Sequence, residues 1–214
     1  MDDFRGKIWV FEDIIDLEYQ EKIKQTLLSH ETNWFYNDNI NVNSDHERRP
    51  CFSHVYYDSE YDRYTDTGTK YHENNRSHLH DLLVPLIDSS CKAIEYNYKY
   101  IIQGRSFLQL PLKINDIQKL DVHHVDRTET HLVVLYYVKD ADGDTIIYNK
   151  RYEPRKRISI FSSESPEEEL KELKRVTPKQ GRVVVFDGLY WHTAEQPKKD
   201  VRCILNFNIS SNGT

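Results

Sequence analysis

The sequence predicts an α+β fold that is mainly β: a double-stranded β-helix (a jelly-roll or cupin-like barrel) with N-terminal helices packed on its outer face. Two observations lead to this prediction. Two helical patterns lie in the N-terminal half of the chain, and a series of short strand patterns follows from about residue 104. Helices and strands in separate runs are typical of α+β architectures, and many short strands favour a sandwich or a barrel.

Length and composition indicate a polar, globular protein. With 214 residues, of which 38% are hydrophobic, we expect a single domain over residues 1–214. Its N-terminal strand and helices should occupy about 1–103, and the jelly-roll core about 104–210. The net charge of −6 argues against nucleic acid as a partner. No signal peptide, membrane span or disulfide-like cysteine spacing is recognisable, so we expect a cytoplasmic protein without a membrane partner. The oligomeric state stays open.

Two segments in the N-terminal half have the spacing of an amphipathic helix. In residues 16–30 apolar side chains recur every three or four positions, and Asp16 is placed to cap the first turn. Residues 77–96 repeat the pattern, and Pro85 is expected to kink or divide that helix. A short strand over residues 7–11 should precede both.

Strand patterns dominate after the second helix. Residues 131–138 are almost continuously apolar, which predicts a central strand buried on both faces. Ser165 and Pro166, followed by three glutamates, instead predict a helix that runs to about Arg175. The other expected strands cover residues 106–110, 112–114, 118–124, 145–148, 158–161, 181–186 and 202–209.

His124 and Asp126 lie two positions apart, at the end of the strand expected over 118–124. Side chains at i and i+2 of a strand leave the same face, so an imidazole and a carboxylate can meet at one metal ion. His192 follows a buried strand and a tight turn, and it is the natural third ligand. Two histidines and one carboxylate form the facial triad of non-haem Fe(II) sites. A hydrogen-bonded core histidine is the simpler alternative for His192.

Arg202 begins the last expected strand, ten residues after His192. If Arg202 points into a mostly apolar barrel, an anion should meet it there, because burying an unpaired charge is costly. Arginine binds carboxylates through two parallel hydrogen bonds, so an acidic cosubstrate would fit. The alternative is a salt bridge between Arg202 and one of the chain's own acids.

This order of residues resembles a known family. His124-x-Asp126, then His192, then Arg202 is similar to the pattern of the Fe(II)- and 2-oxoglutarate-dependent oxygenase superfamily, and most similar to its prolyl 4-hydroxylase-like branch. The resemblance covers roughly residues 105–210. Its supporting context is the Tyr136-Tyr137 end of the central strand, the Asp142-Gly143-Asp144-Thr145 turn and the segment Pro178 to Phe186.

The resemblance implies a role for each of these residues. His124, Asp126 and His192 would hold Fe(II), and Arg202 would bind the far carboxylate of 2-oxoglutarate with help from the Tyr136 hydroxyl. With O2 as the oxidant, and ascorbate as a candidate reductant, such a site hydroxylates its substrate and converts 2-oxoglutarate to succinate and CO2.

Three positions need separate mention. Ile204 stands where much of the family has a serine, and Ile114 stands where many prolyl-hydroxylase relatives have a tyrosine. These departures put in doubt one contact to each end of the cosubstrate. Asn206 should face inward with Arg202, where it could contact cosubstrate or substrate, or equally satisfy a neighbouring backbone group.

The predicted activity is hydroxylation of a protein or peptide side chain, with proline as one candidate, or of a small amino-acid-like molecule. One alternative is oxidation of nucleic acid, with phosphate held by Arg151, Arg155, Lys156 and Arg157. Another is a non-catalytic jelly-roll module that binds a metal. Substrate choice should depend on that basic loop and on residues 37–66.

Overall fold

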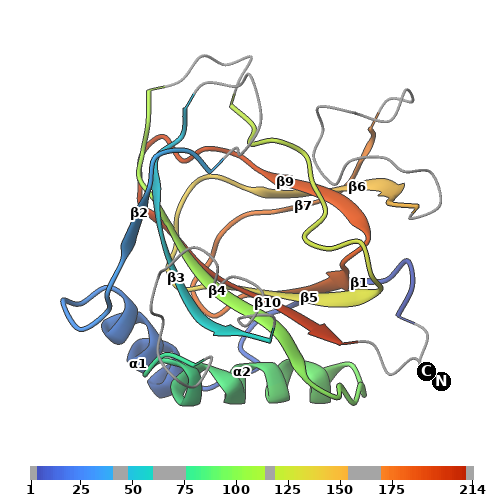
Figure 1. The fold of residues 1–214 in the computed structure, drawn as a ribbon, viewed down its shortest axis with the longest axis horizontal. Coiled ribbons are helices and arrows are strands. Elements are labelled where there is room, and N and C mark those ends of the chain that lie inside the picture. The colour runs from blue at the N-terminus through green and yellow to red at the C-terminus, as the bar shows by residue number, and fades with distance from the viewer. Residues whose placement is uncertain (1–3, 41–47, 60–75, 114–118, 154–169, 211–214) are drawn as a thin grey trace.

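The computed structural model describes residues 4–40, 48–59, 76–113, 119–153 and 170–210 (Figure 1). These residues form two antiparallel sheets and two helices. In chain order the elements are β1 (Ile8–Phe11), α1 (Leu17–Leu27), β2 (Phe35–Asn37), β3 (Cys51–Asp58), α2 (His80–Ala93), β4 (Ile101–Gln109), β5 (His131–Tyr137), β6 (Thr145–Arg151), β7 (Glu172–Val176), β8 (Val183–Asp187), β9 (Tyr190–Ala194) and β10 (Arg202–Ser210).

The two sheets face each other as the walls of a flattened barrel (Figure 1). The larger sheet has seven strands in the order β1-β8-β5-β10-β4-β3-β2, and the smaller sheet has three in the order β7-β6-β9. Both helices lie side by side against the outer face of the larger sheet (Figure 1). The predicted class, a mainly β jelly roll with helices on its outside, is therefore confirmed.

The two helices form where the sequence predicts them. The Asp16 carboxylate accepts a hydrogen bond from the backbone N–H of Tyr19 at 2.8 Å, and α1 buries Ile23 and Leu27 against the sheet. α2 continues through Pro85 as one helix, so the expected division does not occur. The apolar face of α2 packs into the core beneath the larger sheet, and this packing supplies most of a helix's stability.

β5 is buried on both faces, as its apolar sequence predicts. Val134 and Tyr136 belong to the core shared with the helices, whereas Val133, Leu135 and Tyr137 belong to the core between the sheets. This alternation follows from the two-residue period of a strand. The odd-numbered residues of β5 therefore face the interior of the barrel.

Two predicted elements differ from the structure. The helix expected to reach Arg175 is wrong at its C-terminal end, where the chain forms strand β7; its first residues, 165–169, lie outside the described ranges. β7 pairs with β6, and this ladder overrides the local preference for a helix. A strand was expected over 118–124, but its described residues, 119–124, make only isolated bridges, at Leu120 and His124.

Other expectations fall at the margins of the described chain. The strand expected over 158–161 lies outside it, as does residue 114 of the strand expected over 112–114; residues 112 and 113 are not in a strand. In residues 37–66 the described part contains β3 and the end of β2. Neither helix in the described ranges is long and apolar enough to span a bilayer.

Candidate functional site

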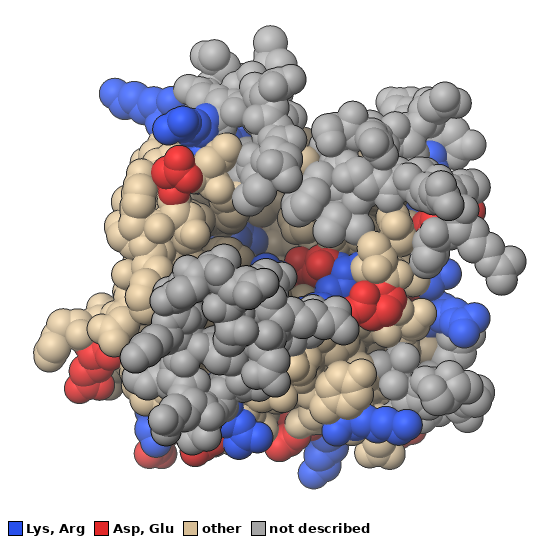
Figure 2. Space-filling view, in the orientation of Figure 1, with Lys and Arg blue, Asp and Glu red and all other residues tan. Residues whose placement is uncertain are grey.

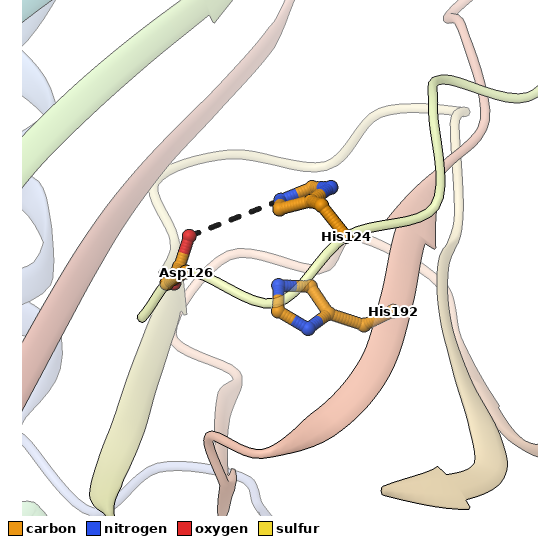
Figure 3. Close-up of side chains that lie close together, drawn as sticks. All are labelled: His124, Asp126 and His192. Carbon is orange, nitrogen blue, oxygen red and sulfur yellow. Dashed lines mark ion pairs between the residues drawn. The ribbon is translucent and has the colours of Figure 1, made fainter. Parts of the chain in front are cut away.

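Three potential metal ligands come together from two distant segments of the chain. His124 and Asp126 lie on the irregular segment before β5, and His192 lies on β9. One ligand atom of each residue is within 4.8 Å of the others. His124 Nε2 is 3.8 Å from Asp126 Oδ1, and Figure 3 shows both imidazole rings close to the carboxylate. Two imidazoles and one carboxylate at this spacing are a suitable donor set for one divalent transition metal.

The main chain fixes the spacing of the two histidines. His124 and His192 exchange two backbone N–H···O bonds of 2.9 Å each, which form an isolated antiparallel bridge. Residues directly opposite each other in such a bridge project their side chains to the same face. The centroids of the two rings are accordingly 4.6 Å apart. This bridge replaces the strand that the sequence predicted there.

Hydrogen bonds also fix which ring nitrogen is available. His124 Nδ1 is 2.8 Å from the carbonyl oxygen of Val122, and His192 Nδ1 is 3.0 Å from that of Tyr190. A carbonyl oxygen only accepts, so each Nδ1 carries a proton and each ring has its lone pair on Nε2, the atom that would ligate a metal. Burial, with a further contribution from His124, lowers the pKa of His192 to about 4. The His192 ring is therefore neutral at neutral pH.

Two side chains of the larger sheet hold the Asp126 carboxylate. Arg105 on β4 donates from Nη2 to Oδ1, and Asn206 on β10 donates from Nδ2 to Oδ2, each at 3.1 Å. Burial by itself would raise the pKa of Asp126, but opposing influences, of which the charge of Arg105 is the largest, hold this pKa well below its usual range. The carboxylate is thus ionised and oriented by the protein alone.

Arg202, at the start of β10, is only 2% exposed. Its Nε donates to the Gly143 carbonyl at 2.8 Å, its Nη1 to Gln109 Oε1 at 2.6 Å and its Nη2 to Thr145 Oγ1 at 2.8 Å. These acceptors are neutral, and no carboxylate of the described residues forms an ion pair with Arg202. Because a guanidinium has five N–H groups, one remains on each terminal nitrogen.

Gln109 connects Arg202 to a buried ion pair. While its Oε1 accepts from Arg202, its Nε2 donates to Asp121 Oδ2 at 3.1 Å. Asp121 Oδ1 accepts in turn from Nη1 of the fully buried Arg49 at 2.6 Å. The positive Arg202 and the negative Asp121 therefore fix the orientation of the Gln109 amide, with its oxygen toward Arg202 and its nitrogen toward Asp121.

A cavity of about 350 Å³ between the sheets is lined by the triad and by Arg202. Its lining between the two ends is apolar and includes Phe107 and Ile204. In the space-filling view a hollow opens near the middle of the molecule, with acidic and basic side chains at its edge (Figure 2). The cavity thus has two polar ends and an apolar middle.

The register of β4 and β10 explains this arrangement. Gln109 pairs with Arg202, Phe107 with Ile204, and Arg105 with Asn206. Paired residues project to the same face of the sheet, so three successive rows line the cavity. The first row contains the buried guanidinium, the second is apolar and the third holds the Asp126 carboxylate.

Comparison with solved structures yields close architectural matches. An oxidoreductase of the 2OG-Fe(II) oxygenase family from Burkholderia pseudomallei aligns with a TM-score of 0.62 and 11% identity, over 96% of this chain and 86% of that one. A prolyl hydroxylase from Trichoplax adhaerens, in complex with a hypoxia inducible factor peptide, aligns with a TM-score of 0.57 and 12% identity, over 96% and 84%. HygX from Streptomyces hygroscopicus, with nickel and 2-oxoglutarate bound, aligns with a TM-score of 0.53 and 11% identity, over 96% and 83%.

This chain has the fold of the Fe(II)/2-oxoglutarate-dependent oxygenases. The resemblance seen in the sequence is confirmed at the level of architecture, which is what identities of 11% and 12% support. No protein-family model and no curated protein sequence matches the chain.

Within this oxygenase fold, Tyr136 does not face the cavity. Its side chain is buried in the core shared with the helices, where its hydroxyl has no hydrogen-bond partner. The predicted contact of Tyr136 with a far carboxylate is therefore wrong, because the odd-numbered residues of β5 face the barrel. Tyr137 lies there instead: its hydroxyl donates to Thr145 Oγ1 at 2.8 Å, and its ring centroid is 5.8 Å from Arg202 Cζ.

The predicted positions on β10 do line the cavity of the oxygenase fold. Ile204 and Asn206 both contribute to its wall, as the two-residue period requires. Asn206 binds the Asp126 carboxylate rather than a backbone group. Ile114, the position where relatives have a tyrosine, lies outside the described residues.

The basic loop considered for nucleic acid is described only at its start. Arg151 Nε forms an ion pair with Oδ2 of the buried Asp187 at 2.7 Å, so its charge is already matched. Arg155, Lys156 and Arg157 lie outside the described ranges.

Sequence reasoning missed three residues of this site: Arg105, Gln109 and Thr145. Arg105 and Gln109 each lie two positions from Phe107 in a segment largely predicted as a strand, so the sequence alone could have shown that the three side chains share a face. Their contacts with β10 could not be predicted, because nothing in the local sequence specifies which distant strands pair.

Proposed function

We propose that this chain is an Fe(II)- and 2-oxoglutarate-dependent dioxygenase whose metal ligands are His124, Asp126 and His192. The observation that carries the proposal is the buried Arg202. Its guanidinium has neutral acceptors around it and one N–H left on each terminal nitrogen, and it lines the same cavity as the triad. A buried cation calls for an anion, and a carboxylate accepts two hydrogen bonds from a guanidinium.

The chemistry of 2-oxoglutarate matches the three rows of the cavity. A carboxylate suits Arg202, methylene carbons suit the row of Phe107 and Ile204, and a keto acid suits a metal held by the triad. The donor set fits Fe(II), because both imidazoles carry their lone pair on Nε2 and the carboxylate is ionised. The bound 2-oxoglutarate of HygX supports the same assignment here.

When bound, Fe(II), 2-oxoglutarate and O2 supply the oxidation, which yields succinate, CO2 and a hydroxylated substrate. The residues of this chain bind and orient. Arg202 holds the far carboxylate, and the carbonyls of Val122 and Tyr190 keep both imidazoles in the ligating tautomer. Arg105 and Asn206 fix the Asp126 carboxylate. The apolar middle of the cavity excludes water around these groups.

We also propose that the substrate is a peptide side chain, with proline as one candidate, or an amino-acid-like molecule. The peptide complex of the Trichoplax adhaerens prolyl hydroxylase supports this choice. Oxidation of nucleic acid finds less support, because the net charge is −6 and Arg151 is paired with Asp187.

The test is spectroscopic and needs no knowledge of the substrate. Anaerobic protein with Fe(II) should develop a weak visible charge-transfer band when 2-oxoglutarate is added. Arg202→Leu should still bind Fe(II) but require at least about a hundredfold more 2-oxoglutarate, since a buried charged hydrogen-bonding partner is worth roughly 3 kcal/mol or more. Arg182→Leu, which removes an arginine paired with Glu12 near the surface, is the matched control. A wild-type protein that binds Fe(II) without any such band would favour a non-catalytic metal-binding module.

A further inference from the structure

Arg105 has more binding capacity than its contact with Asp126 uses. Its side chain is 26% exposed and lines the cavity, and its guanidinium lies 5.4 Å from the centre of the Phe107 ring. Nη2 donates to Asp126, whereas Nε is buried without a hydrogen-bond partner. The ring of Phe107 supports the guanidinium from one side, so its remaining N–H groups are held in place for a ligand.

Asn206, directly across from Arg105 on the neighbouring strand, has an unused acceptor. Only 8% of this residue is exposed; its Nδ2 binds Asp126, but its Oδ1 is buried without a partner and the side chain lines the cavity. A buried acceptor without a donor costs about 1–3 kcal/mol, so a ligand N–H that met it would recover that amount. The Cβ atoms of directly paired residues lie about 5 Å apart, and both side chains reach the Asp126 carboxylate, so the unused donor and acceptor are within reach of one small molecule.

The charges around the cavity also call for a second anion. Among the described residues, the cavity lining has two cations, Arg105 and Arg202, and two anions, Asp121 and Asp126, and Arg49 behind it pairs with Asp121. These five residues leave one net positive charge. A divalent metal adds two positive charges and a dianionic cosubstrate removes two, so one positive charge remains. A charge buried in a mostly apolar cavity is stable when a counter-ion joins it.

We propose that Arg105 and Asn206 form the recognition site for the primary substrate, and that this substrate is a small anion with a free carboxylate next to an N–H donor, as in an N-acylated or an acidic α-amino acid. The carboxylate binds the open edge of the Arg105 guanidinium, and the amino or amide N–H donates to Asn206 Oδ1. This inference rests on the proposed oxygenase function and selects, from its substrate classes, acidic amino acids and N-acyl amino acids over internal residues of a polypeptide.

The experiment compares acids with their amides. Protein loaded with Mn(II), which does not support turnover, and with 2-oxoglutarate is titrated calorimetrically with the twenty free amino acids, their N-acetyl derivatives and the corresponding carboxamides. At least one acid should bind at least tenfold more tightly than its carboxamide. Arg105→Gln should reduce this ratio to near one, and Arg105→Lys should keep part of it. Arg76→Gln, which removes an exposed arginine, should leave the ratio unchanged.

Each ratio is measured within one variant, so a change in metal or 2-oxoglutarate affinity affects both members of a pair equally. The proposal is wrong if acids and carboxamides bind equally well, if no acid binds, if blocked peptides bind best, or if Arg105→Gln keeps the wild-type ratio. A loss of 2-oxoglutarate affinity in Arg105→Gln as large as that in Arg202→Leu would assign Arg105 to the cosubstrate and also overturn it. Failure of the oxygenase proposal is seen separately, as the absence of the Fe(II) and 2-oxoglutarate band in the wild type.

Discussion

Replacing Gln109 with glutamate probes the neutral surroundings of Arg202 while changing almost no volume. In the wild type, Gln109 Oε1 accepts from Arg202 at 2.6 Å and its Nε2 donates to Asp121 at 3.1 Å. Gln109→Glu places a carboxylate against the guanidinium and turns a donor into an acceptor that faces Asp121. Arg202 then has an internal counter-ion, and 2-oxoglutarate has to compete with it.

The size of the effect follows from Coulomb's law. Two carboxylates bound to one guanidinium lie about 6 Å apart, so at an effective dielectric constant of about 20 they repel each other by roughly 3 kcal/mol. This corresponds to roughly a hundredfold weaker binding of 2-oxoglutarate. The introduced carboxylate and that of Asp121 would also lie close enough to share a proton, which raises the apparent pKa of the pair. Lower pH should therefore restore a neutral acceptor beside Arg202 and recover part of the affinity.

The assay is calorimetric titration of 2-oxoglutarate into the Mn(II)-loaded protein at pH 8 and at pH 6. We expect the loss in Gln109→Glu to be larger at pH 8. Gln103→Glu is the matched control, because Gln103 lies on the same strand and likewise donates to an aspartate, Asp58, at 2.7 Å, but does not contact Arg202. Thermal unfolding of both variants would show whether either has lost its fold.

If Gln109→Glu bound 2-oxoglutarate as tightly as the wild type at both pH values, the reasoning would be refuted, because a carboxylate bound at Arg202 must be repelled by a new negative charge beside it. An equal loss in Gln103→Glu would also refute it, since that result would point to a general effect of added negative charge on the sheet.

Three further predictions test the ligands, the corrected tyrosine and the pH dependence of stability. His192→Ala should weaken Fe(II) binding at least about a hundredfold in anaerobic calorimetry while keeping the wild-type circular dichroism spectrum, because one of three ligands is lost. Tyr136→Phe should leave the affinity for 2-oxoglutarate unchanged. Tyr137→Phe should lower the free energy of unfolding by roughly 1 kcal/mol, because only the Tyr137 hydroxyl has hydrogen-bond partners. If the two variants had the same 2-oxoglutarate affinity and the same free energy of unfolding, the assignment of the two tyrosines to opposite faces would be contradicted. Burial lowers the pKa of His131, so the unfolded state binds more protons than the folded state as the pH drops below about 6.5. The free energy of unfolding should then fall by up to ~1.4 kcal/mol per pH unit. In urea unfolding between pH 7.5 and 5.5, His131→Asn should show a smaller fall in this free energy than the wild type.

Much of the fold could be predicted because its signals are local. The Asp16 cap and the spacing of apolar residues define α1, and the continuous apolar run defines β5. Glu172 to Val176 could not be recognised in the same way, since all but Val176 are exposed and the strand exists through its pairing with β6. Propensity is a weak guide for such an edge strand.

The proposed metal ligands were accessible from residue types and chain order, but their surroundings were not. In β5 both faces are apolar, so the sequence has no alternation from which to decide whether Tyr136 or Tyr137 faces the cavity. The partners Arg105 and Gln109 depend on the pairing of β4 with β10, which lie almost a hundred residues apart. Such long-range register is set by the packing of the whole sheet.

The paired backbone hydrogen bonds between His124 and His192 have a consequence for how this centre can change. The two positions are held together by their main chains, so the side chain at 124 or at 192 can be replaced without breaking the hydrogen bonds that fix its direction. A substitution at either position removes a metal ligand but leaves the backbone bridge in place, so loss of the metal is separable from loss of the fold.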